Sequence, residues 1–493
     1  MEKETPGISG LIFAEPLIFE KGRKGRKGYS LPPLDVEEIK PEEVWPSKLI
    51  RPDLEGVPEL SEVEVVRHFT RLSQWNYGLD ANLYPLGSCT MKYNPKVNED
   101  LARLPGFAQT HPYQPEELTQ GALQLMYELQ QYLCEISGLD QVTLQPAAGA
   151  QGELTGMLMI RAYLADQGHP RHKVLVPDTA HGTNPASSSI CGYQVVQVKS
   201  TERGVLSPQD VAAKMDEEVA ALMITNPNTL GLFEEHIVQI AEIVHQKGGQ
   251  IYLDGANLNA LVGLTRVADM GVDVLHFNLH KTFSTPHGGG GPGAGPVGVK
   301  SHLAPYLPIP RVVKENNSFR LDYDRPKSIG QVKSFYGNFG VLVRAYAYIL
   351  SMGAEGLRKA SLVALLNANY LRAQLKEYYH LPYDHPCMHE CVFTDRNQTR
   401  YGINALDIAK RLMDYGFHPP TIYFPLVVSG ALMIEPTETE PKEVLDQFIS
   451  AMIKIAQEAQ SAPELLKSAP HKPKVSRLDE VLANRRPKLR WRP

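Results

Sequence analysis

Asp254-Gly-Ala-Asn257 and, further along, Asn278-Leu-His-Lys281-Thr-Phe283 are the stretches that decide the fold and the chemistry expected of this chain. The acid follows the apolar run Gln250-Ile-Tyr-Leu, and the lysine follows a second apolar run that ends at Phe277. Both runs predict buried strands. Parallel strands end at one edge of their sheet, where ligands of α/β proteins bind. We therefore expect Asp254 and Lys281 to share one site.

An acid and a lysine placed in this way are what pyridoxal 5'-phosphate requires. The lysine amine forms a Schiff base with the cofactor's aldehyde, and the carboxylate keeps the pyridine nitrogen protonated. Attack needs the unprotonated amine, which burial or a positive neighbour such as His280 would favour. Most lysines are surface residues, but the glycine-dense loop Gly288–Gly298 after Lys281 indicates close backbone approach to a ligand. The sequence therefore predicts a pyridoxal 5'-phosphate site.

Other loops at predicted strand ends offer further contacts to the cofactor. The loop from Ala147 to Glu153 joins a strand to a helix, so its backbone N–H groups suit a phosphate, although an ordinary turn is the alternative. His181 can stack on the ring's outer face or be a plain loop histidine. An amide or hydroxyl of the segment 226–231, with Asn228 as the candidate, can hydrogen-bond the phenolic oxygen, or the segment can be a plain proline turn. The candidate cofactor-binding residues are Lys281, Asp254, Ala256, His181, Ala148, Gly149, Ala150, Gln151, Asn228 and His280, of which Lys281, Asp254 and His181 are the catalytic candidates.

Strand-like runs alternate with helical periods along the middle of the chain, and this predicts an α/β fold with a largely parallel sheet. Short β-rich runs are expected at 142–144, 173–176, 195–198, 221–225, 250–254 and 272–277. Leu118, Ala122, Leu125, Leu129 and Leu133 predict one helical face. We expect an N-terminal arm and irregular segment over residues 1–115, a large cofactor-binding domain over 116–335, and a smaller α+β domain with a charged tail over 336–493. Ser61-Glu-Val-Glu64 predicts a helix start.

Bulk composition excludes several classes of protein. The 493 residues are 43% hydrophobic and carry a formal charge of −5, which disfavours a general nucleic-acid binder. No apolar run is long enough to cross a membrane, and the N-terminus lacks the apolar core of a signal peptide. Five cysteines are too few for a disulfide framework in a chain of this length. We therefore expect a cytoplasmic protein.

Two histidine patterns in the sequence could be interpreted as metal-binding sites. His276 and His280 are four residues apart, but the segment is expected to be strand and then loop, so zinc is disfavoured. His385, Cys387, His389 and Cys391 alternate, which would place all four on one strand face. We expect a partly buried strand with incidental cysteines there, and no metal at either place.

Several motifs, in order from about residue 40 to the end, resemble the P-protein of the glycine cleavage system. Those quoted above are joined by Tyr84-Pro-Leu-Gly-Ser-Cys-Thr-Met-Lys-Tyr-Asn-Pro95, His181-Gly-Thr-Asn-Pro-Ala-Ser187, Pro286-His-Gly-Gly-Gly-Gly-Pro-Gly293, Ser334-Phe-Tyr-Gly-Asn338 and Arg477-Leu-Asp-Glu480. The resemblance implies a type-I pyridoxal-phosphate-dependent transferase-like fold. At this length, with the lysine motif present, it implies subunit 2 of the two-subunit form.

The resemblance also implies an activity and partners. The reaction would be decarboxylation of glycine, with release of CO2 and transfer of the aminomethyl group to the lipoyl group of the H-protein. A P-protein subunit 1 would complete an α2β2 heterotetramer. Ser88, Cys89 and Thr90 would lie near the substrate, and the segment Ser334–Asn338 would reach across an interface toward the phosphate. The chain departs from the family at Asn228, where an acid is common, and at the two cysteines that flank His389-Glu390.

Two other readings stay open from sequence. One is another pyridoxal-phosphate-dependent decarboxylase or an aminotransferase, although an aminotransferase would want an arginine for a dicarboxylate substrate. The other is a non-catalytic scaffold subunit, which the presence of Lys281 disfavours.

Overall fold

The computed structural model describes residues 14–51, 54, 56–287 and 293–491. The glycine run Gly288–Gly291 lies outside the described residues. The chain divides into two compact units, one made of Met1–Gly78 with Pro470–Pro493 and the other of Leu79–Ala469. The domain boundaries expected near residues 115 and 335 stay a prediction.

A seven-stranded sheet forms the centre of the larger unit, with the strand order β1-β7-β6-β5-β4-β2-β3. Neighbours from β6 through β5, β4 and β2 to β3 are parallel, whereas β7 runs antiparallel to both β1 and β6. The strands are β1 (Gln141–Thr143), β2 (Lys173–Pro177), β3 (Gln194–Val198), β4 (Val219–Thr225), β5 (Gln250–Gly255), β6 (Val274–Phe277) and β7 (Val297–Val299). The six predicted strands are all present, and the short antiparallel β7 was not predicted.

Alternating side chains of the central strands pack on two different layers of helices. Leu222 and Leu253 join one apolar cluster with α5 (Gln120–Ser137) and α9 (Ile237–Gln246). Met223 and Tyr252 join a second cluster on the other face, with α6 (Gly149–Asp166). Strands that are apolar on both faces are buried in this way in α/β sheets. Leu118 is not part of the α5 face, because it precedes the helix and is exposed.

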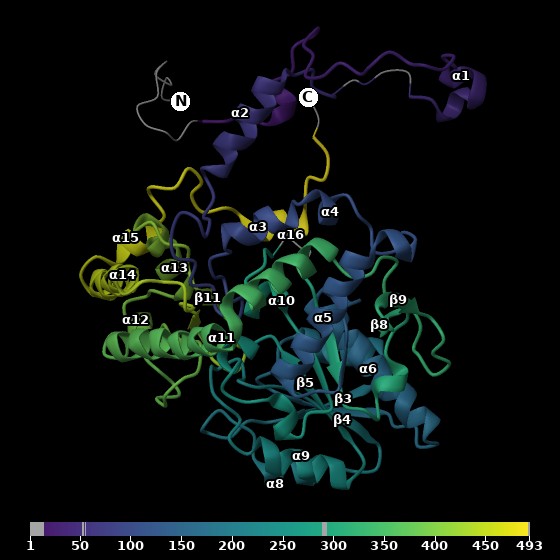
Figure 1. Ribbon diagram of the computed structural model, residues 1–493. Coiled ribbons are helices and arrows are strands. Elements are labelled where there is room, and N and C mark those ends of the chain that lie inside the picture. Colours follow the sequence, from purple (N-terminus) through teal and green to yellow (C-terminus); the bar gives the residue numbers. More distant parts are fainter. Residues whose placement is uncertain (1–13, 52–53, 55, 288–292, 492–493) are drawn as a thin grey trace. The chain divides into compact units, whose positions relative to one another are not determined.

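A smaller antiparallel sheet, in the order β10-β12-β11, forms a separate layer of the same unit. The smaller sheet packs with the second half of α11 (Phe339–Leu375) and with α13 and α14, and α11 is interrupted at Gly353 (φ 58°). Figure 1 shows α13, α14 and α15 gathered beside α11, away from β3 to β5. The remaining elements of this part are β10 (Cys391–Thr394), β11 (Thr421–Ile422), β12 (Ala431–Ile434), α12 (Arg396–Thr399), α13 (Ala405–Asp414), α14 (Lys442–Ser461) and α15 (Pro463–Ser468).

Shorter elements complete the larger unit. Before the sheet come α3 (Lys96–Ala102) and α4 (Pro105–Ala108). Within the α/β part lie α7 (Thr183–Ile190), α8 (Pro208–Lys214), α10 (Leu279–Thr282) and the hairpin of β8 (Arg311–Glu315) with β9 (Ser318–Asp322).

The smaller unit contains α1 (Pro41–Val44), α2 (Glu62–Ser73) and α16 (Glu480–Arg485). The expected capping box is present at the start of α2, where Ser61 Oγ accepts the N–H of Glu64 at 3.4 Å. Among the described residues, no helix is both long and apolar enough to span a membrane.

Candidate active site

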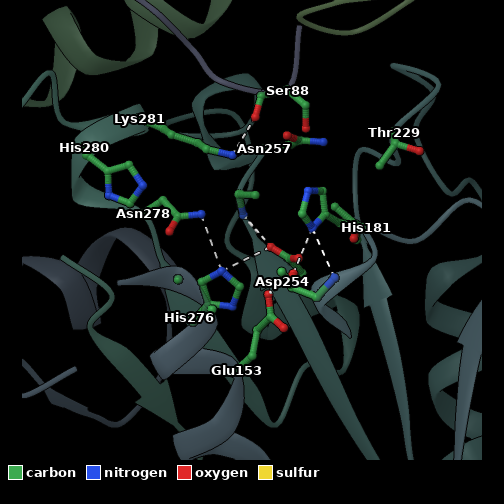
Figure 2. A pocket seen from close by; sticks show the side chains of 15 residues that line it. Ser88, Glu153, His181, Thr229, Asp254, Asn257, His276, Asn278, His280 and Lys281 are labelled. Carbon is green, nitrogen blue, oxygen red and sulfur yellow. Dashed lines mark hydrogen bonds and ion pairs between the residues drawn. The ribbon is translucent and has the colours of Figure 1, made fainter. Parts of the chain in front are cut away.

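A cavity of about 170 Å³ lies where the parallel strands β4, β5 and β6 end. Thr225 ends β4, Asp254 lies near the end of β5, and Lys281 lies in the short helix α10 directly after β6. In the view of Figure 2, Lys281 and His181 project into the cavity above Asp254. The cavity is lined by Ser88, Gly149, Ala150, Glu153, His181, Thr183, Thr225, Thr229, Asp254, Ala256, Asn257, His276, Asn278, His280 and Lys281.

Asp254 is buried at the floor of the cavity and its carboxylate is held by three donors. Its Oδ1 accepts the backbone N–H of Ala256 at 2.9 Å and faces His276 Nε2 at 3.1 Å, while its Oδ2 accepts from Asn184 Nδ2 at 2.9 Å. The other ring nitrogen of His276 is bonded to the hydroxyl of Tyr252 at 2.8 Å. The carboxylate therefore has a fixed orientation.

These contacts determine which side chains at the floor of the cavity are protonated. Burial alone would raise the pKa of Asp254, but the charge and hydrogen bond of His276 outweigh it and hold that pKa well below its usual value. Burial alone would lower the pKa of His276, and the Asp254 carboxylate raises it instead. Asp254 is thus an anion beside an imidazolium. Burial and the charge of Asp254 raise the pKa of Glu153, which accepts hydrogen bonds from Thr183 Oγ1 (2.7 Å) and Ser187 Oγ (2.8 Å).

Lys281 directs its amine across the cavity from α10. Its Nζ donates to the backbone carbonyl of Ser88 at 2.6 Å. Burial lowers the pKa of His280 to about 3, with His287 and Lys281 contributing. His280 is therefore neutral at pH 7 and does not supply the positive charge that the sequence suggested beside Lys281.

The first turn of α6 supplies unpaired backbone N–H groups to the cavity, because helix N-termini leave their first donors without intrahelical partners. A Cβ on Gly149 would meet Asn278 Oδ1 at 2.5 Å, so only glycine allows this approach. Ala148 is the N-cap and does not itself line the cavity. Gln151 does not line the cavity; its side chain accepts from Ala147 N in its own loop at 2.7 Å and donates to Val332 O in a distant segment at 2.7 Å.

Of the other predicted contacts, His181 and Ala256 line the cavity and Asn228 does not. His181 is exposed on the open side, with its Nδ1 2.8 Å from Thr183 Oγ1 and its ring edge-on to Phe424. The Asn228 amide nitrogen is buried and donates to Gly204 O at 2.8 Å and Glu234 Oε1 at 2.9 Å. Thr229, the next residue, lines the cavity instead.

Glu153 was not predicted from the sequence to be a site residue. His276 was considered only as a possible metal ligand, and that role was disfavoured. The periodicity of a strand shows that His276 is buried, but its partner Asp254 belongs to the neighbouring strand, and only the register of β5 and β6 pairs the two residues directly. Glu153 carries no sequence signal beyond its place in the first turns of α6.

The alternating His385–Cys391 pattern does not form a strand face, because β10 begins only at Cys391 and His385 is exposed. Both cysteines are buried, whereas His389 and Glu390 belong to a second buried cluster. The segment at Ser334–Asn338 contacts its own chain, where Asn338 Nδ2 donates to Ala147 O at 3.0 Å beside the start of α6.

Solved structures with the same architecture define the class of fold. A glycine decarboxylase (P-protein) of the glycine cleavage system in inhibitor-bound form aligns with a TM-score of 0.72 and 22% identity, over 86% of this chain and 100% of that chain. A sphingosine-1-phosphate lyase of Burkholderia pseudomallei aligns with a TM-score of 0.62 at 13% identity, over 84% of this chain and 94% of that chain. The fold is that of the type-I pyridoxal-phosphate-dependent enzymes.

Sequence relatives define the family. The family profile described as "Glycine cleavage system P-protein" matches residues 34–321, and "Glycine dehydrogenase, C-terminal domain" matches 360–473. Relatives named "Probable glycine dehydrogenase (decarboxylating) subunit 2" are 60% identical in Caldanaerobacter subterraneus subsp. tengcongensis and 59% identical in Halalkalibacterium halodurans. They cover 96% and 97% of this chain, and 98% of each relative. The chain belongs to the glycine cleavage system P-protein family.

Proposed function

We propose that this chain binds pyridoxal 5'-phosphate and decarboxylates glycine, passing the aminomethyl group to the lipoyl group of the H-protein. We also propose that it works with a P-protein subunit 1 in an α2β2 assembly in the cytoplasm. The single observation that carries the proposal is the meeting of the Asp254 carboxylate and the Lys281 amine in one small cavity, in a chain 60% identical to a glycine dehydrogenase subunit.

The residues present fit this cofactor. Asn278 Oδ1, Asn257 Oδ1 and Thr225 Oγ1 belong to residues of the cavity wall and are buried without a hydrogen-bond partner within the described part of the chain. Buried polar atoms are normally paired, so these three favour a polar ligand. The close approach at Gly149 leaves the first N–H groups of α6 open to an anion such as a phosphate.

Each residue has a role that follows from its contacts. Lys281 Nζ would hold the aldehyde end, and the α6 N-terminus would bind the phosphate. Asp254, kept anionic by His276, would hold the proton on the pyridine nitrogen. His181 would pack on the outer face of the ring, with Ala256 on the other. When bound, the cofactor disperses the negative charge left on the glycine carbon as CO2 departs.

The competing activities lack support from the cavity. Among the described residues that line it there is no arginine, which an aminotransferase of dicarboxylates would use. A scaffold subunit has no use for a lysine amine facing a buried acid.

The transfer of the aminomethyl group changes the lipoyl disulfide. A new C–S bond forms at one lipoyl sulfur as the S–S bond breaks, so the disulfide is reduced.

A trapping experiment tests this function. The chain, co-purified with a subunit 1 and loaded with pyridoxal phosphate, would be reduced with borohydride and mapped by mass spectrometry, with Lys281 expected to carry the cofactor. Exchange of labelled bicarbonate into glycine should then depend on the lipoylated carrier. A label on a different lysine, or exchange that ignores the carrier, would overturn the proposal.

A further inference from the structure

The loop Ser88-Cys-Thr90 lies over the cavity in a strained conformation. Ser88 (φ 62°) and Thr90 (φ 49°) both adopt the left-handed region, which L-residues other than glycine rarely occupy. Each such residue costs about 1–3 kcal/mol, more readily borne when the surroundings enforce it. The loop matters to the site, because the carbonyl of Ser88 accepts the hydrogen bond from Lys281 Nζ.

Two buried carboxyl groups beside the smaller sheet enforce this conformation. Glu390 Oε2 accepts the N–H of Ser88 at 2.7 Å. Glu435 accepts both the N–H of Thr90 at 2.8 Å and its hydroxyl at 2.6 Å. Glu390 precedes β10 and Glu435 follows β12, and the antiparallel pairing of Cys391 with Ile434 makes the two acids neighbours. Both are completely buried.

Within the described part of the chain, His389 is the basic side chain recorded within 4.0 Å of these two acids. His389 Nε2 lies 3.6 Å from Glu390 Oε1 and 4.0 Å from Glu435 Oε1, and neither ring nitrogen makes a hydrogen bond within the described residues. Burial lowers the pKa of His389 to about 3, so it is neutral. The ionisable and charged groups that act on the pair are His389, Cys89, Lys281, Cys387, Cys391 and Glu438.

Glu390 and Glu435 bring carboxyl oxygens within 4.8 Å of each other, and Glu390 Oε1 has no hydrogen-bond partner among the described residues, so one retained proton relieves the repulsion between two adjacent buried anions. Burial, followed by the charge of Glu435, raises the pKa of Glu390 far above its usual value, and burial also raises the pKa of Glu435. A bound metal fits less well than a proton, because a metal-ligating histidine fixes its second nitrogen with a hydrogen bond and His389 Nδ1 has none here.

We propose that Glu390 and Glu435 share a proton and together position the Ser88–Thr90 loop, so that the Ser88 carbonyl receives the Lys281 amine whenever a substrate amine displaces it from the cofactor. The inference rests on the proposed function, since displacement requires the cofactor. In the exchange a bond forms from the glycine nitrogen to the aldehyde carbon and the bond from Nζ to that carbon breaks. Two protons pass from the glycine ammonium to Nζ, which leaves as an ammonium group.

The freed ammonium explains why the acids lie where they do. Its charge appears beside Ser88, whose carbonyl accepts the hydrogen bond from Nζ, next to a carboxyl pair that carries one negative charge. Glu390 and Glu435 are positioning residues, because they contact the loop and not the reacting atoms.

The test follows displacement of Lys281 by glycine in the assembled, cofactor-loaded protein, by rapid-mixing absorbance from about pH 6 to about pH 9, all of it above the ordinary carboxyl pKa of about 4.3. Deprotonation of the glycine amine speeds displacement in every variant as pH rises, so each rate is compared with that of Glu390→Gln, whose amide oxygen still accepts from Ser88 and cannot ionise. Relative to Glu390→Gln the wild type should slow as pH rises, because ionisation of both carboxyls makes them repel. Glu390→Ala should slow displacement about tenfold at every pH, the equivalent of one lost hydrogen bond of about 1.4 kcal/mol.

Asp395→Asn is the matched control, because Asp395 is a buried acid directly after β10 that accepts the N–H of Ala405 at 2.8 Å and does not line this cavity. It should follow the wild-type profile. A Glu390→Gln profile parallel to that of the wild type, or a tightly bound metal ion that Glu390→Ala removes, would overturn the shared proton. Absence of a borohydride label on Lys281 in the wild type would instead overturn the proposed function.

Discussion

Two buried clusters, each of two carboxyl groups and one histidine, flank the amine of Lys281 and place their protons in opposite ways. In the floor cluster the histidine is charged and one acid is strongly ionised, whereas in the loop cluster the histidine is neutral and the acids hold the proton. The floor cluster is Glu153, Asp254 and His276, and the loop cluster is His389, Glu390 and Glu435.

Hydrogen-bond geometry accounts for the difference. In the floor cluster His276 Nε2 is 3.1 Å from Asp254 Oδ1, and its other nitrogen is fixed by Tyr252. In the loop cluster the nearest carboxyl oxygen is 3.6 Å from His389 Nε2, beyond a good hydrogen bond. A buried imidazolium is stable only when a paired anion offsets its desolvation. A few tenths of an ångström thus decide which cluster carries an ion pair and which carries a neutral acid.

Breaking the ion pair at its acid should have the largest effect. Asp254→Asn would leave the pyridine nitrogen of the proposed cofactor without an anionic partner. We therefore expect kcat to fall about a thousandfold, the scale of losing one preorganised electrostatic group. Binding of glycine should change much less, because the group acts on charge that develops during decarboxylation. Steady-state exchange kinetics measure both, and equal losses in kcat and glycine affinity would show that Asp254 is only structural.

Removing the cation of the same pair should have a smaller effect. His276→Gln keeps a hydrogen-bonding side chain but leaves Asp254 without its positive neighbour. We therefore expect kcat to fall about tenfold and the free energy of unfolding to fall by about 3 kcal/mol. Because the folded pKa of His276 is raised, its contribution is complete below the unfolded value of about 6.5 and disappears as pH rises through the folded value.

The Asp254 contribution has the opposite sign. Its folded pKa is lowered, so its stabilisation is present above about pH 3.9 and is lost as pH falls through the folded value. Denaturant unfolding at several pH values should therefore show an alkaline decline in the wild type that His276→Gln lacks. An unchanged alkaline decline in the variant would place the relevant proton elsewhere.

The sequence was sufficient to find the acid and lysine of the site but not the clusters around them. Asp254 and Lys281 lie at strand ends, where local pattern and the geometry of parallel sheets converge. Glu390 and Glu435 lie 45 positions apart in sequence, and only the antiparallel register of β10 and β12 brings them together. Short edge elements such as β7, with three residues, are likewise fixed by tertiary pairing and carry little periodicity.

Under the proposed function the floor cluster acts on a cofactor ring that lies over it, and the start of α6 would set the position of that ring. Gly149→Ala places a methyl group 2.5 Å from Asn278 Oδ1, so we expect about tenfold weaker binding of pyridoxal phosphate, equivalent to about 1.4 kcal/mol. Gly121→Ala in α5 is the control, because no heavy atom lies within 4 Å of its added Cβ. Equilibrium titration of both variants with the cofactor would detect the difference, and equal affinities would argue against the phosphate site.

The smallest predicted effect tests the loop cluster at a single hydroxyl. Thr90→Val removes the donor to Glu435 Oε1 but leaves the backbone N–H to Oε2 and keeps the β-branched shape at the same positive φ. The backbone strain is therefore unchanged. The expected loss of about 1 kcal/mol in the free energy of unfolding then reports the hydroxyl group alone. Thr437→Val is the control, since Thr437 is also buried at positive φ but its hydroxyl bonds only neutral groups, the hydroxyl of Thr439 at 3.1 Å and the backbone N–H of Thr439 at 3.4 Å. Denaturant unfolding should rank Thr90→Val as the more destabilised variant if Glu435 carries negative charge, because hydrogen bonds to ions are the stronger. Equal destabilisation of the two variants would mean that Glu435 is the neutral member of the pair and that the anion is Glu390.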